Sequence, residues 1–545
     1  MKIALAQVNY LIGDFEGNTR KILNHIEKAK SQQADLVVFA ELSICGYPPR
    51  DFLEFDDFIH RCYDQIELIA AQCKDIAVIV GAPSINPNPK GKPLYNTAFF
   101  LANGKIEAEV HKTLLPTYDI FDEYRYFEPN RSFSIIPFKG KNIALTICED
   151  LWNISDNPLY IQSPMDELAL LSPDVMINIA ASPFHSEQAH DRLDIMVRNT
   201  AKYQIPLVYV NHVGAQTELL FDGGSMVVDK HGVVQCMTKF FEEDFCVTDI
   251  DALETGIRIT QNETPDKIAL IHDALVMGIR DYFKKLNFGK AILGLSGGID
   301  SAVTLALAAE ALGAENVRAV LLPSRYSSEH SIDDAVGLAK NLGCQYDLIP
   351  IDDAFSAFEK SLEPVFNGIP FGLAEENIQA RTRAVLLMGM ANKLGYILLN
   401  TSNKSEAAVG YGTLYGDMCG GISVLGDVYK TDVFKLAWYI NRNQEIIPEN
   451  SITKPPSAEL RPDQKDSDSL PEYDLLDQIL YLYIEKRQGP TEIIAAGYEA
   501  AIVNRVLKMV NSNEWKRQQT PPILRVSYKA FGSGRRMPIV ARYLL

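Results

Sequence analysis

Apolar runs alternate with amphipathic stretches through the first 250 residues of the chain. Helical apolar spacing predicts helices over Asn18–Ser31 and Ile59–Cys73. Short runs rich in Val, Ile and Leu predict buried strands at Ile3–Val8, Leu36–Ala40, Ala77–Gly81, Ala98–Leu101, Ile143–Cys148, Val175–Ile179, Leu207–Asn211, Ser225–Val228 and Phe245–Ile250. This alternation predicts a layered α/β domain. Because helices become fewer in its second half, we expect a mixed sheet.

A polar, turn-rich stretch at 253–265 interrupts this pattern and predicts a linker. It separates a first domain, 1–252, from a second domain, 266–545. The second domain opens with a predicted helix and continues in strand–helix units, at Asp266–Leu286, Ala291–Leu293, Arg318–Pro323, Ser331–Leu342, Ile378–Leu394 and Tyr396–Asn400. Such units predict a second, parallel sheet that binds ligand at the carboxyl ends of its strands.

Two long polar stretches, Gly410–Gly426 and Ile447–Pro471, follow these units. The first is rich in glycine, and the second is dense in Pro, Ser, Asp and Glu. Long loops inside a compact domain are usually functional or disordered. Because both stretches follow units near the expected ligand site, we expect them to act as lids.

Composition narrows the class of protein. A chain of 545 residues is too long for one core. Acidic residues outnumber basic ones by 70 to 52, and a net charge of −18 argues against nucleic acid and anionic membranes as partners. No apolar run is long enough to span a bilayer or to form a signal peptide. Eight cysteines without a Cys-x-x-Cys pair predict buried, reduced thiols and a cytoplasmic protein.

The strongest motif is the string Gly294-Leu295-Ser296-Gly297-Gly298-Ile299-Asp300-Ser301, which lies between a predicted strand and a predicted helix. Such a turn presents unpaired backbone N–H groups at the positive end of a helix, where phosphate binds. The string lacks the lysine of a P-loop and the spacing of a dinucleotide fingerprint. A plain capped turn is the alternative for Ser-Gly-Gly taken alone.

The whole string, placed after a strand, resembles the pyrophosphate-binding loop of the ATP pyrophosphatases. Those enzymes cleave ATP to AMP and pyrophosphate while they adenylate an acceptor. The resemblance implies that Ser296 to Gly298 hold pyrophosphate. Asp300 cannot itself bind an anion, and we expect it to hold Mg²⁺ beside the phosphates.

Three reactive groups end apolar runs in the first domain: Glu41, Lys112 and Cys148. Taken singly, a strand-end Glu is usually solvated and a strand-end Cys usually belongs to the core. Together they fit thiol attack on an amide or nitrile carbon. Glu41 would remove the thiol proton, and Lys112 with the backbone N–H of Glu149 would stabilise the oxyanion. We also expect Lys112 to lower the pKa of the thiol.

This Glu–Lys–Cys order resembles the nitrilase, or carbon–nitrogen hydrolase, superfamily over roughly residues 1–250. The strings Asn211-His212-Val213-Gly214 and Phe221-Asp222-Gly223-Gly224-Ser225 resemble a later strand and hairpin of that family. The resemblance implies an αββα sandwich for the first domain. For the second domain, the ATP-cleaving loop implies a doubly wound parallel sheet like that of the adenine nucleotide alpha hydrolases.

The two halves together resemble the glutamine-dependent NAD synthetases, which convert deamido-NAD to NAD with ATP and glutamine. The resemblance implies glutamine-binding roles for Tyr118, Ser182 and Gln188. The family commonly has Gly-Lys where this chain has Glu187-Gln188, so the third contact lacks the usual charge. Glu123 is either a second carboxylate beside Lys112 or a surface residue.

The same resemblance assigns roles in the second domain. Thr401, Lys430 and Ser457 match ATP contacts, together with the loop residues. Asn377, Arg381, Glu406 and Lys516 match deamido-NAD contacts, and Glu406 with Asp300 makes a plausible Mg²⁺ pair. If Lys516 reaches a neighbouring subunit, the enzyme is a homo-oligomer.

Two other classes of function stay open at this point. A related amidotransferase would use the same loop to amidate another carboxylate or a nucleotide base. A nucleotide sensor would bind ATP without turnover, although the intact Glu–Lys–Cys set argues against it. A nitrilase acting alone would leave the second domain unexplained.

Overall fold

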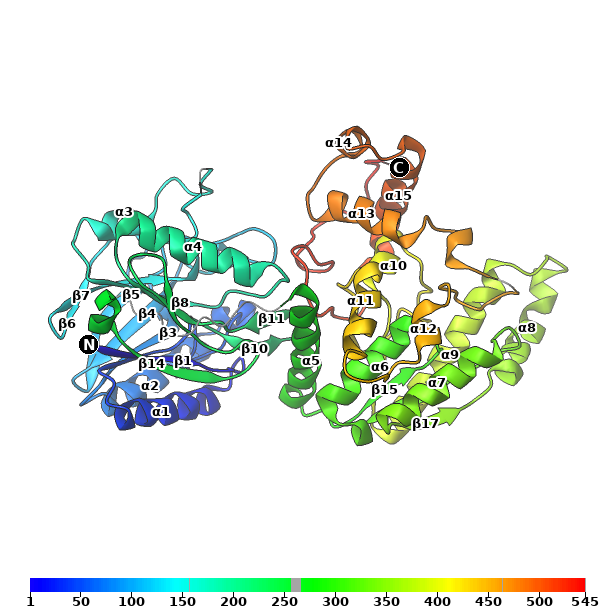
Figure 1. The fold of residues 1–545 in the computed structure, drawn as a ribbon, viewed down its shortest axis with the longest axis horizontal. Coiled ribbons are helices and arrows are strands. Elements are labelled where there is room, and N and C mark those ends of the chain that lie inside the picture. The colour runs from blue at the N-terminus through cyan, green and yellow to red at the C-terminus, as the bar shows by residue number, and fades with distance from the viewer. Residues whose placement is uncertain (156, 256–265, 463, 545) are drawn as a thin grey trace. The chain divides into compact units, whose positions relative to one another are not determined.

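The computed structural model describes residues 1–155, 157–255, 266–462 and 464–544. The chain divides into two compact units, Met1–Pro265 and Asp266–Leu545 (Figure 1). Most of the predicted linker, 256–265, lies outside the described residues. Among the described residues, no helix combines the length and the apolar character needed to cross a membrane.

The first unit contains two six-stranded sheets. In sheet order, the first sheet consists of β14 (Asp244–Asp249), β1 (Lys2–Gln7), β2 (Leu36–Val38), β3 (Ala77–Ile85), β4 (Leu94–Ala102) and β5 (Lys105–His111). The second consists of β13 (Val234–Met237), β12 (Met226–Val228), β9 (Leu207–Asn211), β8 (Val175–Ala180), β7 (Lys141–Ile147) and β6 (Ile136–Phe138). Both sheets are mixed, with parallel pairs in their centres (β1–β2–β3 and β7–β8–β9) and antiparallel pairs at their edges.

Helices cover the outer faces of these sheets. α1 (Phe15–Ser31) and α2 (Asp56–Gln72) pack on the first sheet, and α3 (Pro164–Ala169) and α4 (Gln188–Tyr203) pack on the second (Figure 1). Between the sheets, apolar side chains of β1–β4 form one core cluster with those of β7–β9. Central strands buried on both faces explain the continuous apolar runs of the sequence. The predicted αββα sandwich is confirmed.

Several elements of this unit were not predicted: β5, β6, β13, α3 and α4. The hairpin of β10 (Val213–Gln216) with β11 (Leu219–Asp222) overlaps the two strings that resemble a strand and hairpin of the nitrilase family. β5 alternates between exposed and half-buried residues, so it lacks an apolar run. The expectation of free thiols is also wrong for one pair. Cys236 in β13 and Cys246 in β14 form a disulfide, because the fold brings strands of the two sheets together there.

The second unit is built on a five-stranded sheet in the order β17 (Gln345–Leu348), β16 (Val317–Leu321), β15 (Ala291–Gly294), β18 (Ile397–Asn400) and β19 (Ile422–Ser423). All neighbouring strands are parallel. The chain adds strands on one side of β15 and then on the other, so the topology reverses between β15 and β18. Ligands bind at the carboxyl ends of strands beside such a switch point. The predicted doubly wound sheet is confirmed.

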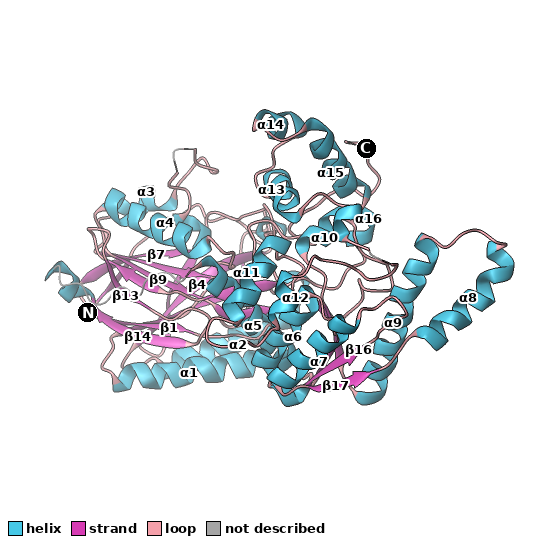
Figure 2. Ribbon diagram, turned by 45° about the vertical axis from the view of Figure 1, so that its right-hand side comes forward, coloured by secondary structure: helices cyan, strands magenta, loops and turns pink. Residues whose placement is uncertain are grey.

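Helices surround this sheet and extend beyond it (Figure 2). They are α5 (Lys267–Lys285), α6 (Ile299–Leu312), α7 (Glu329–Leu342), α8 (Asp352–Phe366), α9 (Leu373–Leu394), α10 (Lys404–Val409), α11 (Lys430–Ile440), α12 (Glu449–Thr453), α13 (Tyr473–Ile484), α14 (Pro490–Ala495), α15 (Ala500–Ser512) and α16 (Glu514–Arg517). α10, α13 and α15 share a separate apolar cluster, which also includes residues close to the C-terminus.

The two expected lids are partly regular structure. Gly410–Gly426 contains β19, the edge strand of the sheet. Ile447–Pro471 contains α12 and a short 3-10 helix at Asp466–Asp468. Neither stretch shows a long apolar or helical period, because each element is only a few residues long. What the remaining residues of these stretches do as lids stays a prediction.

Candidate active sites

Three strand ends deliver the predicted reactive groups of the first unit. Glu41 follows β2, Lys112 follows β5 and Cys148 follows β7. Cys148 opens a 3-10 helix, Cys148–Leu151, and has a φ of +44°. A non-glycine residue in that region is strained, and such strain is typical of functional sites. The sharp turn ends the strand and starts the short helix at the thiol.

Lys112 lies at the centre of a buried charge cluster. Its Nζ is 2.7 Å from Glu41 Oε1 and 2.8 Å from Glu123 Oε2, and all three side chains are almost fully buried. Burial lowers the pKa of Lys112, but Glu123 and Glu41 outweigh it and raise the pKa well above its ordinary value. Lys112 is therefore a fixed cation. Glu123 is the second carboxylate beside it, and the surface alternative is excluded.

Glu41 is held by further donors. Its Oε1 accepts a hydrogen bond from Asn96 Nδ2 at 2.7 Å, and its Oε2 accepts one from the backbone N–H of Ala181 at 2.9 Å. Tyr47 donates to Glu123 at 2.9 Å. These contacts come from several strands and loops, so the carboxylate has one orientation before substrate arrives.

The thiol of Cys148 is protonated in this environment. Burial and the charge of Glu41 raise its pKa well above the ordinary value, and the lowering effect of Lys112 is smaller. Lys112 therefore lowers the pKa of the thiol, as expected, but burial outweighs this effect and the net pKa is raised. Attack by the sulfur then requires a base that removes the proton as the bond forms, and Glu41 is the carboxylate beside it.

The residues expected to bind glutamine form two groups, one directly after Ala181, which donates to Glu41, and one beside Glu149. Gln188 Nε2 donates to Ser182 Oγ at 2.9 Å, and both residues are buried. Tyr118 donates through its hydroxyl to the Glu149 carboxylate at 2.9 Å, and Tyr160 donates to the same carboxylate at 3.2 Å. The structure therefore pairs Ser182 with Gln188 and places Tyr118 beside the residue that follows Cys148.

Sequence reasoning did not single out the groups that orient this site, such as Asn96, Tyr160 and the side chains of Glu149 and Asp150. Asn96 lies inside β4, and Glu149 and Asp150 are almost fully buried. A polar residue within an apolar run is a signal for such a role, since buried polar groups require partners. The sequence does not say which partner each one has.

In the second unit, the predicted phosphate loop connects β15 to α6. Gly297 has a φ of +79°, and a Cβ built there would lie 2.2 Å from the backbone oxygen of Ser331. Only glycine fits this position. Ser296 Oγ accepts a hydrogen bond from Gly298 N–H at 3.2 Å and lies 3.1 Å from Ser301 Oγ. The loop therefore turns tightly onto the N-terminus of a 14-residue helix, which is the geometry that anions favour.

Two carboxylates and one lysine meet beside this loop. Lys430 pairs with Asp300, and its Nζ is 3.5 Å from Glu406 Oε1. Burial and the neighbouring Asp300 raise the pKa of Glu406 to about 8. Asn403 Nδ2 also donates to Asp300 Oδ1 at 3.0 Å. The two carboxylates are the donor type that Mg²⁺ prefers, and a cation between them would relieve their repulsion.

Three of the four residues expected to contact deamido-NAD converge on one glycine-rich loop, Gly410–Gly416. From α9, Asn377 Oδ1 accepts a hydrogen bond from Thr413 Oγ1 at 2.7 Å, and Arg381 Nε donates to the Leu414 oxygen at 3.1 Å. From α16, Lys516 Nζ donates to the oxygens of Gly410 and Gly412 at 2.9 and 3.0 Å. Glu406 lies in α10, which leads into the loop. The structure thus gathers residues from distant parts of the sequence.

The other expected ATP contacts lie beside the same strand ends. Thr401 directly follows β18. Ser457 is exposed and lies in a segment that Lys454 and Glu459 anchor to Ser331, at 3.0 and 2.8 Å. Ser331 is also the residue against which Gly297 packs. Lys454 is a further cation near the phosphate loop that sequence reasoning missed, and its Lys-Pro-Pro context gave no signal.

Comparison with known proteins matches both units. The carbon–nitrogen hydrolase family model matches residues 2–258, and the NAD synthase model matches residues 271–520. A glutamine-dependent NAD(+) synthetase of Synechocystis sp. is 44% identical, with 99% of each chain covered. The chain belongs to the glutamine-dependent NAD(+) synthetase family. A family member from Thermotoga maritima is 40% identical, with 100% of this chain and 99% of that one covered.

Solved structures of the family agree with this fold. The synthetase of Acinetobacter baumannii, in complex with adenosine diphosphate, is 37% identical and has a TM-score of 0.79 over 99% of this chain and 98% of its own. The synthetase of Cytophaga hutchinsonii is 22% identical with a TM-score of 0.84, which shows the shared fold alone. The family assignment makes the chain a carbon–nitrogen ligase of the amidotransferase type, with ATP as a substrate.

Proposed function

We propose that this chain converts deamido-NAD to NAD in an ATP-dependent amidation that uses ammonia released from glutamine. Deamido-NAD is first adenylated, and the products are NAD, AMP, pyrophosphate and glutamate. The observation that carries this proposal is the presence in one chain of a buried Glu–Lys–Cys cluster and an ATP-pyrophosphatase loop. One supplies ammonia and the other activates a carboxylate, so neither alone explains the chain.

In the first unit, Glu41 takes the proton of Cys148 as the sulfur attacks the amide carbon of glutamine. Lys112 and the backbone N–H of Glu149 stabilise the negative oxygen that forms. Glu41 then gives the proton to the leaving ammonia, and later activates the water that releases glutamate from the thioester. Tyr118, Ser182 and Gln188 hold glutamine. The fixed position of Glu41 between Lys112 and Ala181 supports this assignment.

In the second unit, the backbone N–H groups of 294–301 hold the phosphates of ATP, and Thr401, Lys430 and Ser457 contact the nucleotide. Asn377, Arg381, Glu406 and Lys516 hold deamido-NAD around the loop Gly410–Gly416. Asp300 and Glu406 would hold Mg²⁺, and the bound ion would supply positive charge beside the leaving pyrophosphate. Among the described residues, no cluster of three or more metal-ligating side chains occurs, so phosphate oxygens and water would complete the coordination.

An acceptor assay tests the function directly. Purified protein receives ATP, Mg²⁺ and either glutamine or ammonium, with deamido-NAD as the sole acceptor, and AMP and NAD are measured. We expect equal amounts of AMP and NAD. Background AMP would refute the proposal, and turnover with a different acceptor alone would indicate a related amidotransferase. ATP binding without pyrophosphate would indicate a nucleotide sensor.

We expect a homo-oligomer, because Lys516 matches a family position that can serve a neighbouring subunit. We also expect a cytoplasmic enzyme, because its proposed substrates are intracellular metabolites. Sedimentation velocity tests the first, and cell fractionation tests the second. A monomer at micromolar concentration with full activity would contradict the first.

A further inference from the structure

Asp150 connects two of the segments that form the glutamine site. Its Oδ1 accepts hydrogen bonds from the backbone N–H groups of Thr113 at 3.0 Å and Leu114 at 2.8 Å. Its Oδ2 accepts one from the backbone N–H of Ile147 at 3.0 Å. Thr113 directly follows Lys112, and Ile147 directly precedes Cys148. One carboxylate therefore ties the lysine segment to the nucleophile segment.

Only a carboxylate satisfies this arrangement. Three donors approach it from two sides, so both of its oxygens must act as acceptors. An asparagine would turn its NH₂ group toward at least one of the three N–H groups and leave a buried donor unpaired, which is costly. Asp150 is only 2% exposed, and burial raises its pKa to about 7. The backbone donors oppose that rise and favour the ionised form.

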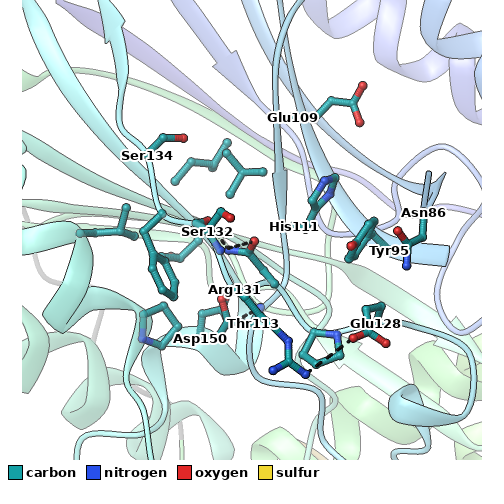
Figure 3. A pocket seen from close by; sticks show the side chains of 18 of the residues that line it. Asn86, Tyr95, Glu109, His111, Thr113, Glu128, Arg131, Ser132, Ser134 and Asp150 are labelled. Carbon is teal, nitrogen blue, oxygen red and sulfur yellow. Dashed lines mark hydrogen bonds and ion pairs between the residues drawn. The ribbon is translucent and has the colours of Figure 1, made fainter. Parts of the chain in front are cut away.

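A cavity of about 490 Å³ lies on the side of β5 and β7, and Asp150 is one of the residues that line it. Asp150 and Thr113 contribute to its wall together with His111, Arg131, Ser132 and Thr146. Figure 3 shows Asp150 and Thr113 beside each other on one side of the cavity, with Arg131 and Ser132 close by. The lining is rich in hydroxyl and other polar groups, so small polar molecules can enter.

We propose that Asp150 is a positioning residue for glutamine hydrolysis, which fixes the position of Lys112 relative to Cys148. We also propose that, when the Asp150 side chain is removed, small carboxylates can enter from the cavity and occupy the space it leaves. This inference rests on the proposed glutaminase activity. Asp150 does not touch the amide. It acts through the two backbone segments, and a shift of about 1 Å in either group can cost about 100-fold in rate.

Chemical rescue tests the inference. Asp150→Ala removes the carboxylate and leaves space that opens to the cavity, where formate can enter and accept the same N–H groups. We expect kcat for glutamine hydrolysis to fall about 100-fold with little change in KM, because the bond-forming geometry is lost. Formate at about 0.1 M should restore kcat about tenfold, whereas chloride at equal ionic strength should not.

A matched control comes from the same unit. Asp229 is equally buried, and its Oδ1 accepts hydrogen bonds from the backbone N–H groups of His231 and Val233, both at 2.9 Å. It lies in the turn after β12, away from the three reactive segments. Asp229→Ala should lower the thermal midpoint without changing kcat per folded molecule, and formate should have no effect on its rate.

If the alanine variant fails to fold, Asp150→Asn replaces it in the experiment, because asparagine has nearly the same size and shape as aspartate. We expect its kcat to fall while its thermal midpoint stays near that of Asp229→Ala. In every folded variant, NAD synthesis from ammonium should be unchanged. Wild-type kcat in a folded Asp150 variant, or a loss that formate does not reverse in Asp150→Ala, would overturn the inference. Failure of the wild-type protein to release glutamate would instead refute the proposed function.

Discussion

The two candidate sites differ in how far their charged groups are arranged before substrate arrives. In the first unit, Glu41, Lys112 and Glu123 are buried together, and Lys112 Nζ lies 2.7 Å from the Glu41 carboxylate and 2.8 Å from the Glu123 carboxylate. In the second unit, Arg381 and Ser457 are exposed, and Lys516 is half-buried and bonded to backbone oxygens of a glycine-rich loop. The charged groups of the first site are therefore already paired in the folded chain, whereas several side chains of the second site lie on or beside loops.

The difference follows from the chemistry of each site. Thiol attack on an amide forms and breaks covalent bonds at protein atoms, so nucleophile, base and cation must be fixed to within a fraction of an ångström. Nucleotide binding uses charges whose partners arrive with the substrate. Asp300 and Glu406 repel each other and share Lys430, so bound phosphates and Mg²⁺ would complete this site. Mutations should therefore affect the two sites in different ways.

The largest effect should come from the nucleophile. Cys148→Ala should lower glutamine-dependent NAD formation about 10⁴-fold or more, because no other group can form the thioester. Ammonium-dependent formation should persist. Cys62→Ala, which removes another buried free thiol of the same unit, is the matched control and should retain both activities. Loss of both activities in Cys148→Ala would show that the two sites are not separable.

The carboxylate pair of the second unit should give the next largest effect. Asp300→Asn or Glu406→Gln should reduce NAD formation from either nitrogen source about 100-fold or more, and should raise the Mg²⁺ concentration at half-maximal rate. Glutamate release measured alone should change less. Asp347→Asn removes a carboxylate that pairs with Arg318 at the edge of the same sheet, and should leave the Mg²⁺ dependence unchanged. An unchanged Mg²⁺ dependence in both site variants would contradict the metal assignment.

A substitution at Glu123 tests how much its ion pair with Lys112 contributes to the geometry of the first site. Glu123→Gln removes one partner of Lys112, and kcat for glutamine hydrolysis should fall about 10- to 100-fold, the usual cost of losing a supporting group. Glu109→Gln, at an exposed carboxyl in β5, is the control. An unchanged kcat in Glu123→Gln would show that Glu41 alone suffices to hold the lysine.

The same variant carries a pH signature. Burial raises the pKa of Glu123 to about 7, above its value of about 4.3 in an unfolded chain. Between these values the folded protein binds more protons than the unfolded chain, so the unfolding free energy should fall as pH rises from about 4.5 to 7. The contribution is at most about 1.4 kcal/mol per pH unit. Denaturant titrations should show a flatter pH dependence in Glu123→Gln.

Gln188 should give the smallest effect. Gln188→Lys restores the charge that the family commonly has at this position, and a charge-assisted hydrogen bond to the carboxylate of glutamine is about twice as strong as a neutral one. We expect KM for glutamine to fall about three- to tenfold with little change in kcat. Gln204→Lys, at the exposed end of α4, is the control. A higher KM in Gln188→Lys would show that the bond between Gln188 and Ser182 matters more than charge.

Local patterns were sufficient for the motifs of both sites. The phosphate loop depends on a few consecutive residues, since glycine at 297 is required by the local φ and by the close approach of Ser331. Glu41, Lys112 and Cys148 each end a strand, so their order along the chain predicted a common site. Central strands were also predicted within a few residues, because burial on both faces leaves an apolar run.

Contacts between residues far apart in the chain could not be predicted from the sequence. Asp150 binds the segments of Lys112 and Cys148, and Lys516 reaches a loop about a hundred positions earlier. The net pKa shift of Cys148 also depends on burial by the whole sandwich, which outweighs the expected lowering by Lys112.

The sequence by itself determined which reactive groups the protein carries and where its central, apolar strands lie. Only the tertiary structure decided which of these groups form ion pairs with one another and which thiol keeps its proton. The reason is physical: a motif is set by neighbours along the chain, whereas burial and ion pairing are set by neighbours in space.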